Sequence, residues 1–443
     1  MTRPQYAPAV TSADTTKRRW ALAALSPAEP LDERQRLILM LVGLASMATA
    51  FLNTVFTQTV AFAAEEFDVS TTAQGAGAAV VRAGIVICLP LVALADRRGR
   101  RPLIVALAWI SPLVTALGAV APNFPFLVAT QVIGRPLGLT LDILVAVLAI
   151  EEMPRNSRAW ATGMLAVLSG VGAGVAVAAL PLADLGASWW RAVYLLALLW
   201  LLVALALTRR LPESRRFTGP AIDAPATARR LPRLPRLPRG FGPHLGRICT
   251  VVFLTNVYVA TASIFQNRYL RDERGYSALM IALFTVATSA PAGLGLVAGG
   301  RVADARGRRV LGATMVPLGA MLLAVSFAVS GPPMWAAAIA GSLAFGIAYP
   351  AMSVYRGELF PTRVRSTAGG IIMTSSLLGG IVGLVGGGAA LDTTLSYGAV
   401  MAALVTGPVV AALIVWFRYP ETARLSLEEI TGDGPDRDAT PTP

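Results

Sequence analysis

Three ionisable side chains lie deep inside long apolar stretches of this sequence, where charge is unfavourable. Arg135 and Asp142 stand in one stretch, "GRPLGLTLD", and Arg82 stands in an earlier one. Because burying such a group in an apolar setting costs free energy, each is a candidate for function. A carboxyl group can bind and release a proton there, and a guanidinium can attract an anion or modulate that titration.

Arg135 and Asp142 are seven residues apart, which is about two turns of one helix and places them on a similar face. They could form an ion pair, although Pro136 could bend the helix between them. Two interpretations stay open at this point. The pair could stabilise helix packing, or Asp142 could carry a proton while Arg135 senses its charge.

Arg82 has no counterpart in the second half of the chain, where Ala290 stands. Its long side chain could extend toward an end of its helix, or it could face an internal cavity. In the second case Arg82, Arg135 and Asp142 together carry one net positive charge. That balance favours an anionic or zwitterionic ligand.

The elements that must position these residues are membrane-spanning helices. The chain is 55% hydrophobic and 14% charged, whereas soluble proteins are roughly a quarter charged. Its apolar windows are long enough to cross a bilayer as helices. Twelve spans are predicted near 37–59, 75–95, 102–121, 125–150, 159–182, 188–208, 248–267, 278–300, 309–330, 333–355, 366–390 and 396–417.

The distribution of basic residues sets the orientation. With the N-terminus inside, the inner segments hold 32 of the 38 Lys and Arg residues. The outer loops hold only Arg191, Arg268, Arg271 and Arg274. Both termini are therefore predicted to be cytoplasmic. The net charge of +13 follows from these basic loops and requires no nucleic-acid partner, and no cleavable signal peptide is expected.

The sequence contains no motif typical of a metal site, a disulfide framework or a nucleotide-binding loop. The two cysteines lie in apolar segments, the single histidine lies in a basic loop, and a phosphate-binding Gly-rich loop is absent from the sequence. We therefore expect no cofactor, no metal site and no enzymatic activity. The expected organisation is a cytoplasmic segment (1–36), a six-helix bundle (37–208), a basic Pro-rich linker (209–247), a second bundle (248–417) and a largely disordered tail (418–443).

An internal repeat supports the two-bundle organisation. "LADRRGRR" (94–101) returns as "VADARGRR" (302–309) at an offset of 208 residues. "EEMPRNSR" returns as "ELFPTRVR" at an offset of 207, and "LPES" returns as "YPET" at an offset of 208. All three motifs fall at predicted cytoplasmic ends of helices. Acids there need nearby cations, because helix C-termini carry negative partial charge, and the glycines permit tight turns.

The doubled Asp-x-Arg-Gly-Arg-Arg, Glu-x6-Arg and Pro-Glu-Ser/Thr motifs resemble the major facilitator superfamily, and most closely its branch of sugar porters and organic-ion and metabolite:proton symporters. The resemblance covers about residues 37–425. It implies an all-α integral membrane protein with twelve helices in two six-helix bundles that works by alternating access. It also implies a cytoplasmic gate that joins the bundles, formed by Asp96, Gly99, Arg100, Arg101, Glu151, Arg158 and Glu213 with Asp304, Gly307, Arg308, Arg309, Glu358, Arg365 and Glu421.

The same resemblance places the first, fourth, seventh and tenth spans around a central cavity. Candidate substrate-binding or coupling residues are Asn53, Gln58, Arg82, Arg135, Asp142, Asn256, Tyr258 and Tyr349. Two features depart from related subfamilies. The seventh span lacks the Gln-Gln pair that is usual in sugar porters, and the first span carries Asn53 rather than an acid.

The resulting expectation is a secondary transporter of a small organic solute, coupled to protons, with the charge balance weakly favouring an anion. Its expected partners are that solute, protons and membrane lipids, and we expect a monomer in a bacterial inner membrane. An efflux carrier for drugs or amphiphiles with the same fold is the alternative.

Overall fold

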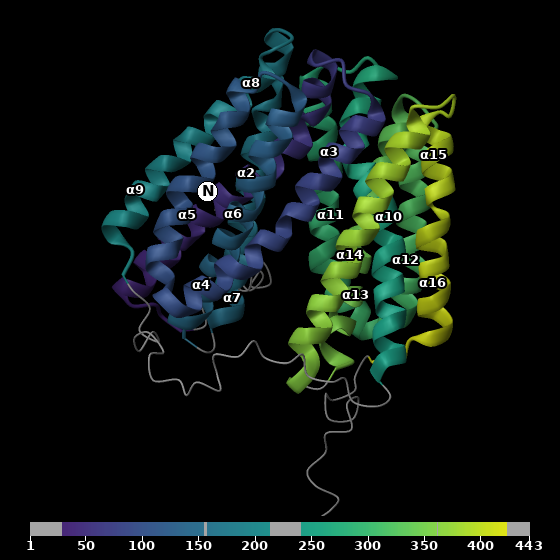
Figure 1. Ribbon diagram of the computed structural model, residues 1–443. Coiled ribbons are helices and arrows are strands. Elements are labelled where there is room, and N and C mark those ends of the chain that lie inside the picture. The colour runs from purple at the N-terminus through teal and green to yellow at the C-terminus, as the bar shows by residue number, and fades with distance from the viewer. Residues whose placement is uncertain (1–28, 155–156, 213–240, 361, 423–443) are drawn as a thin grey trace, which may run out of the picture.

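The computed structural model of this protein describes residues 29–154, 157–212, 241–360 and 362–422, and its regular elements are helices. The predicted basic linker and C-terminal tail lie mostly outside these residues. Figure 1 shows the described helices gathered in two groups, one for each half of the chain.

The N-terminal bundle contains six membrane-length segments, several of which include a short 3-10 turn. In chain order the elements are α2 (Glu33–Glu66), α3 (Thr71–Ala83) with η1 (Gly84–Ile87) and α4 (Cys88–Arg98), α5 (Arg100–Ala116) with η2 (Leu117–Val120), α6 (Phe124–Glu152), α7 (Arg158–Ala178) with η4 (Leu180–Leu185), and α8 (Trp190–Leu195) with η5 (Leu196–Trp200) and α9 (Leu201–Arg210).

The C-terminal bundle repeats this plan with longer uninterrupted helices. Its elements are α10 (Phe241–Asp272), α11 (Ala278–Arg306), α12 (Arg308–Ser326), α13 (Pro332–Glu358), α14 (Thr362–Leu391), and α15 (Tyr397–Leu404) followed by α16 (Thr406–Arg418). Pro136 lies inside α6 and Pro350 inside α13, and both helices continue through them.

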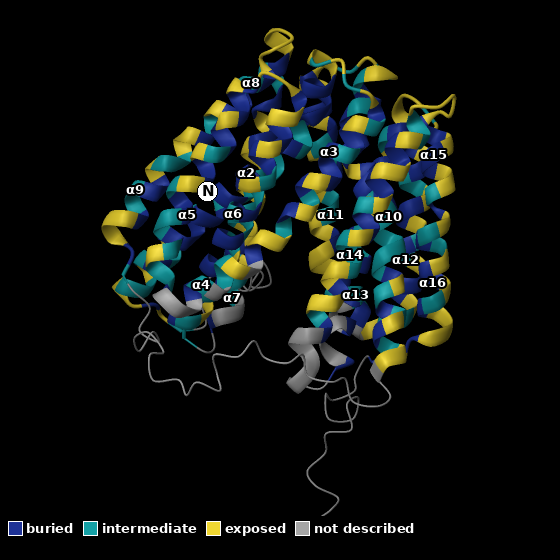
Figure 2. Ribbon diagram, in the orientation of Figure 1, coloured by how far each residue is buried: buried dark blue, intermediate teal, exposed yellow. Residues whose placement is uncertain are grey.

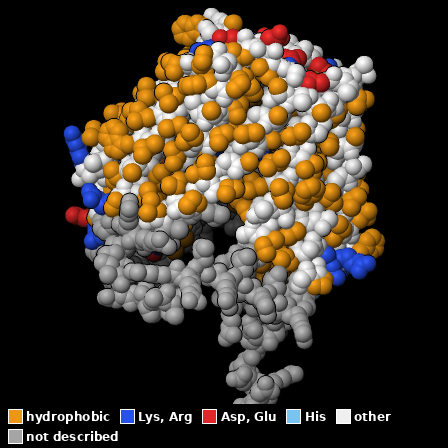
Figure 3. All heavy atoms as spheres, in the orientation of Figure 1, with side chains coloured by type: hydrophobic (Ala, Val, Ile, Leu, Met, Phe, Trp, Pro, Cys, Tyr) orange, Lys and Arg blue, Asp and Glu red, His pale blue; other side chains and the backbone are white. Residues whose placement is uncertain are grey.

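Twelve helical segments among the described residues are long and apolar enough to cross a membrane, and each overlaps one of the twelve predicted spans. Apolar side chains cover the middle of the molecule, whereas charged side chains gather near its two ends (Figure 3). Exposed residues occur along the outward faces of the helices (Figure 2). The predicted fold of twelve transmembrane helices in two bundles is confirmed.

Glycines allow helices to approach closely inside each bundle. A Cβ atom added to Gly172 on α7 would lie 2.0 Å from the carbonyl oxygen of Met47 on α2. One added to Gly383 on α14 would lie 2.1 Å from the carbonyl oxygen of Val257 on α10. The Gly-rich fifth and eleventh spans therefore serve the close contacts expected of small residues in membrane helices.

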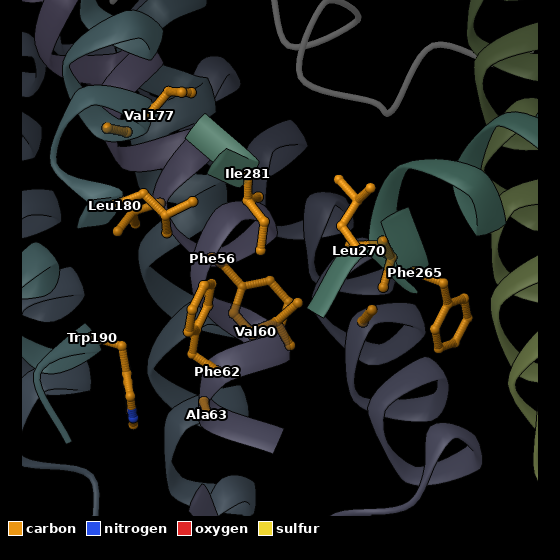
Figure 4. Close-up of a cluster of buried hydrophobic side chains, with 14 of the residues drawn as sticks. Phe56, Val60, Phe62, Ala63, Val177, Leu180, Trp190, Phe265, Leu270 and Ile281 are labelled. Carbon is orange, nitrogen blue, oxygen red and sulfur yellow. The ribbon is translucent and has the colours of Figure 1, made fainter. Parts of the chain in front are cut away.

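The apolar core is shared at one end of the molecule and divided at the other. One cluster joins both bundles and includes Phe56 and Trp190 from the N-terminal half with Phe265 and Ile281 from the C-terminal half (Figure 4). Toward the predicted cytoplasmic end, each bundle has a separate cluster, around Leu144 in one and Tyr355 in the other. The bundles are thus packed together at the predicted outer end, and Figure 3 shows a hollow between them at the opposite end.

Candidate functional site

Arg82 crosses between the two bundles at the middle of the fold. It lies on α3, and its guanidinium donates to Oδ1 of Asn256 on α10 at 3.3 Å. Asn256 in turn donates to Oγ of Ser376 on α14 at 2.5 Å. Gly380 provides the space, because an added Cβ would lie 2.6 Å from Nη1 of Arg82. Arg82 therefore faces the inter-bundle region, and the alternative in which it extends toward a helix end is not what the structure shows.

Arg135 lies on α6, which packs against α3, the helix that carries Arg82. Its helix, α6, contacts the Arg82 segment closely: an added Cβ on Gly84 would lie 2.8 Å from the carbonyl oxygen of Val132. The structure thus places these two arginines of the N-terminal bundle on adjacent helices. Their positive charges favour a negatively charged ligand nearby.

Asp142 has a different partner from the one considered in the sequence. Its carboxylate accepts a hydrogen bond from the Thr49 hydroxyl on α2 at 3.0 Å. The ion pairs found among the described residues do not include Arg135 with Asp142. The suggested ion pair is therefore wrong for this conformation. Two turns of helix separate the groups, and a hydroxyl from the neighbouring helix is nearer to the carboxylate.

Two adjoining cavities are present, one within the C-terminal bundle and one between the two bundles. The larger has a volume of about 470 Å³ and is lined by residues of α10, α11, α12, α13 and α16, including Asn256 and five aromatic side chains. The smaller, about 250 Å³, is lined mainly by hydroxyl and amide side chains. Ser263, Gln266 and Ser342 belong to both linings. The described residues that line them carry no charge, and Arg82 reaches the edge of the larger cavity through its hydrogen bond to Asn256.

The remaining candidate side chains have distinct surroundings. Asn53 on α2 has a buried Oδ1 without a partner among the described residues and lies near Gly138 of α6. Gln58 lines the smaller cavity and accepts a hydrogen bond from Asn267. Tyr258 and Tyr349 both line the larger cavity. Tyr258 is fully buried and donates to the carbonyl oxygen of Ala320 at 3.0 Å, so its hydroxyl also ties α10 to α12.

Polar contacts join the bundles at the outer end. Asn267 donates to the carbonyl oxygen of Gln58 at 2.9 Å, and Arg268 donates to the carbonyl oxygen of Val69 at 3.0 Å. Arg271 forms an ion pair with Glu65. Two aspartates, Asp184 and Asp392, also bond to backbone N–H groups of the opposite bundle. With the shared apolar core, these contacts close the outer end.

The described contacts of the cytoplasmic motif residues lie within single bundles. Arg100 pairs with Glu151, and Arg101 donates to the carbonyl oxygen of Leu211 at 2.6 Å. Glu421 accepts from the backbone N–H groups of Arg308 and Arg309 at 2.9 and 3.1 Å, which caps the start of α12. Gly99 and Gly307 adopt φ values of 93° and 99°, as the predicted tight turns require. The side chains of Asp96, Arg158, Glu213, Asp304, Glu358 and Arg365 lie outside the described residues.

Several residues of this region were missed by the sequence reasoning. Gln266, Asn267 and Ser376 are ordinary polar residues of membrane helices, and neither charge nor repeat position distinguishes them. Asp184 and Asp392 could have been found, because they are separated by the same 208 residues as the cytoplasmic motifs. Their position at predicted loop ends made them resemble ordinary solvated residues.

A family model and a curated relative each match part of this chain. Residues 247–435 match the family model described as "Major Facilitator Superfamily". Solute carrier family 22 member 11 of Homo sapiens is 33% identical over 131 residues, covering 29% of this chain and 21% of that protein. The aligned stretch therefore spans about a fifth of the length of this curated relative.

Solved transporter structures share the fold over most of the chain. The inward-open xylose transporter XylE from E. coli has a TM-score of 0.69 at 19% identity, covering 89% of this chain and 98% of that one. A mutant form of the nucleoside transporter NupG has a TM-score of 0.70 at 12% identity, covering 86% and 100%. An inward-facing, occupied bacterial homolog of the human lysosomal transporter Spinster has a TM-score of 0.70 at 18% identity, covering 87% and 97%.

The twelve membrane-length helices among the described residues thus identify a multi-pass membrane protein. Residues 247–435 match the Major Facilitator Superfamily model, and the chain shares the fold of the solved transporters.

Proposed function

We propose that this protein is a secondary active transporter that moves a small organic anion by alternating access and couples that movement to protons. The observation that carries the proposal is the position of Arg82, which reaches from α3 to Asn256 at the edge of a cavity with an uncharged lining, while Arg135 lies on the adjacent helix α6. Positive charge that is partly removed from water attracts anions more strongly than surface charge does.

Asp142 is the proposed proton carrier. It is the acid nearest in sequence to Arg135 within α6, and its described hydrogen bond comes from a neutral hydroxyl rather than from a cation. With Asp142 ionised, the three groups carry one net positive charge. Protonation of Asp142 raises that charge to two, so proton binding and anion binding favour one another, and this coupling is reciprocal.

The distribution of contacts supports alternating access. Contacts that join the bundles gather at the outer end and at Arg82. Toward the predicted cytoplasmic end, each bundle has its own apolar cluster. Such an arrangement corresponds to a conformation closed outside and open inside. In the opposite conformation, we propose that the two motif sets form the cytoplasmic gate.

We further propose a monomer embedded among lipids of a bacterial inner membrane. The basic inner loops fix the orientation, and each bundle has its own buried core toward the cytoplasmic end. The sequence uses a single lysine, Lys17, among its 38 basic residues. That bias toward arginine is typical of GC-rich bacterial genes.

The second candidate function is efflux of drugs or amphiphiles. One observation favours it: the larger cavity is lined mostly by apolar and aromatic side chains, including Phe345 and Tyr349. In this case neutral or cationic hydrophobic compounds would bind, and the two arginines would serve helix packing. The two candidates therefore differ in the charge of the compounds that the protein accepts.

Reconstitution tests the proposal directly. Purified protein is placed in proteoliposomes, and accumulation of labelled anionic, cationic and neutral solutes is measured with and without a proton gradient. Gradient-driven accumulation of anions is expected, and Asp142→Asn is expected to lose it while retaining exchange of labelled for unlabelled solute. Full accumulation by Asp142→Asn would exclude Asp142 as the carrier. Transport restricted to neutral or cationic hydrophobic compounds would favour the efflux function.

A further inference from the structure

The two halves of the protein offer different chemistry to a bound molecule. The guanidinium groups of Arg82 and Arg135 come from α3 and α6 in the N-terminal bundle. The 470 Å³ cavity is lined entirely by residues of the C-terminal bundle, and its aromatic members include Tyr258, Phe345 and Tyr419. A molecule that satisfies both halves must carry negative charge at one end and an apolar body at the other.

Asn256 marks the boundary between these two environments. It lines the apolar cavity, and its amide oxygen accepts the hydrogen bond from Arg82. A neutral amide is a weaker partner for a guanidinium than a carboxylate, which carries the opposite charge and can accept two parallel N–H bonds. An anion that reaches the mouth of this cavity can therefore replace Asn256 as the acceptor.

We propose that the substrate is an amphipathic organic monoanion. Its charged group binds Arg82 in place of Asn256, and its aromatic or aliphatic body occupies the C-terminal cavity. The volume suits this class, because small-molecule sites commonly measure about 300–1,000 Å³ and are mostly apolar with a few polar groups. The inference deepens the proposed function and rests on it, since it specifies which organic anions bind.

Three matched probes test the substrate class. Binding of 4-phenylbutyrate, its neutral amide 4-phenylbutyramide and the hydrophilic anion lactate is measured on the purified full-length protein in a non-ionic detergent by microscale thermophoresis. We expect 4-phenylbutyrate to bind at least tenfold more tightly than either of the others. Preference for lactate would overturn the amphipathic inference while preserving anion transport. Preference for 4-phenylbutyramide would contradict both the inference and the proposed anion selectivity.

Substitutions inside and outside the cavity test whether the body of the substrate binds there rather than at the outward surface of α16. Ala412 lines the cavity, whereas its neighbour Leu413 is 51% exposed on the outward face of α16. Ala412→Phe is expected to weaken 4-phenylbutyrate binding at least tenfold and to leave lactate binding unchanged. Leu413→Phe adds the same ring outside the cavity and is expected to change neither. Equal binding of 4-phenylbutyrate by the two variants would overturn the assignment of the cavity.

Substitutions of Asn256 test the exchange of partners at Arg82. Asn256→Asp supplies a permanent carboxylate, so 4-phenylbutyrate affinity is expected to fall at least tenfold. Asn256→Ala removes the competitor, so affinity is expected to stay equal or to rise. A comparable loss in both variants would show that Asn256 binds the substrate directly and would contradict the proposed exchange.

A second, independent inference concerns the outer closure. Asp184, after α7, accepts hydrogen bonds from the backbone N–H groups of Ala278 and Leu279 at 2.6 and 2.9 Å. Asp392, after α14, accepts from the backbone N–H groups of Thr71 and Thr72, each at 2.9 Å. Each aspartate therefore caps a helix of the opposite bundle, α11 in one case and α3 in the other.

Both of these helices also have an N-cap of their own. Ser70 accepts from the N–H of Ala73, and Ser277 accepts from the N–H of Met280. The aspartates satisfy N–H groups of the first turn that the serines do not reach, and their charge suits the positive end of each helix. When the bundles part, the serine caps remain and only the aspartate bonds are lost.

We infer that Asp184 and Asp392 form a pair of reversible inter-bundle caps that hold the outer end closed. The test uses protein in which Cys88 and Cys249 are replaced by serine and Ser263→Cys places a thiol at the cavities. Its reaction with a membrane-impermeant thiol reagent is followed from the outside in right-side-out vesicles. Asp184→Ala and Asp392→Ala are each expected to raise the rate at least threefold, and the double variant is expected to raise it further.

Glu273→Ala is the matched control, because Glu273 is an exposed outer acid without a described hydrogen bond to the opposite bundle. It is expected to leave the rate unchanged. Circular dichroism and an unchanged thermal unfolding midpoint establish that each variant is folded. Unchanged outside reaction in both folded aspartate variants would overturn the inference.

Discussion

Gly307→Ala should destabilise the C-terminal bundle through two separable effects. Gly307 joins α11 to α12 with φ 99° and ψ 135°, a region in which a residue with a side chain is strained by about 1–3 kcal/mol. An added Cβ would also lie 2.7 Å from Oε2 of Glu421, the carboxylate that caps α12. Loss of an N-terminal cap costs about 0.5–2 kcal/mol. Together the two effects predict a loss of about 1.5–5 kcal/mol in the free energy of unfolding.

Gly331→Ala is the matched control for the backbone effect. Gly331 has φ 68° and ψ −149° before α13, and the space around an added Cβ is open. It should lose only the backbone contribution of about 1–3 kcal/mol. Unfolding is measured by circular dichroism as SDS is added to protein in dodecyl maltoside micelles.

A double-mutant cycle isolates the cap. Glu421→Ala should cost about 0.5–2 kcal/mol in the wild-type background and almost nothing in the Gly307→Ala background, because the cap is already displaced. An equal cost of Glu421→Ala in both backgrounds would refute the reasoning that the Cβ acts through Glu421.

Three further predictions concern gating and coupling. Arg308→Glu should disturb the proposed cytoplasmic gate and increase labelling of a cytoplasmic-mouth cysteine, and unchanged labelling with unchanged transport would remove Arg308 from that gate. Burial alone would raise the pKa of Asp392, but hydrogen bonds from Thr71, Thr72 and Ser70 lower that pKa below its usual value. The contribution of Asp392 to outer closure is therefore complete above the usual pKa of about 3.9. That contribution is lost only as the pH falls through the lowered pKa of the folded protein. The outside labelling rate of Ser263→Cys, divided at each pH by the rate of the same protein with Asp392→Asn, should accordingly stay constant between pH 8 and 5, and a ratio that rises as the pH falls would contradict this. Thr49→Val removes the hydrogen bond to Asp142, so the pH dependence of solute accumulation should shift while exchange persists, and an identical pH profile would dissociate Thr49 from coupling.

The fold could be predicted from the sequence because its signals are repeated and strong. Each apolar window is long enough to cross a membrane, and the backbone of such a segment must satisfy its own hydrogen bonds by forming a helix. The basic residues predict which helix ends face the cytoplasm, and the motifs repeated at an offset of 207 or 208 residues predict two similar bundles. Gly99 and Gly307 illustrate the agreement, since both adopt the positive φ values that a tight turn between helices requires.

The candidate site could be predicted only in part. Charge alone identified Arg82, Arg135 and Asp142, because ionisable residues inside apolar windows are rare. Their partners could not be predicted, since the acceptor of Arg82 lies 174 residues away and the donor to Asp142 lies 93 residues away. Helical spacing suggested an ion pair between Arg135 and Asp142. Packing of α2 against α6 instead places the Thr49 hydroxyl at the carboxylate.

The cavity linings show a second limit of the sequence. Ser263, Gln266 and Ser342 become a common polar surface only when α10 and α13 face the same cavities. Polar residues of this kind also hydrogen-bond between helices. Their types alone therefore do not show whether they line a cavity or join two helices. The repeat, in contrast, contained Asp184 and Asp392 in matching positions, and a comparison of the outer loops would have revealed them.

Thermal stabilisation by ligands of different charge tests the central claim most directly. Purified wild-type protein and the Arg82→Gln/Arg135→Gln double variant are heated with organic anions, organic cations and neutral solutes of similar size. A ligand at one hundred times its Kd stabilises the native state by about 2.7 kcal/mol. We predict that anions stabilise the wild-type protein and that the double variant loses this stabilisation. Equal stabilisation of both proteins by anions, or stabilisation by cations and neutral compounds alone, would contradict anion recognition by the two arginines.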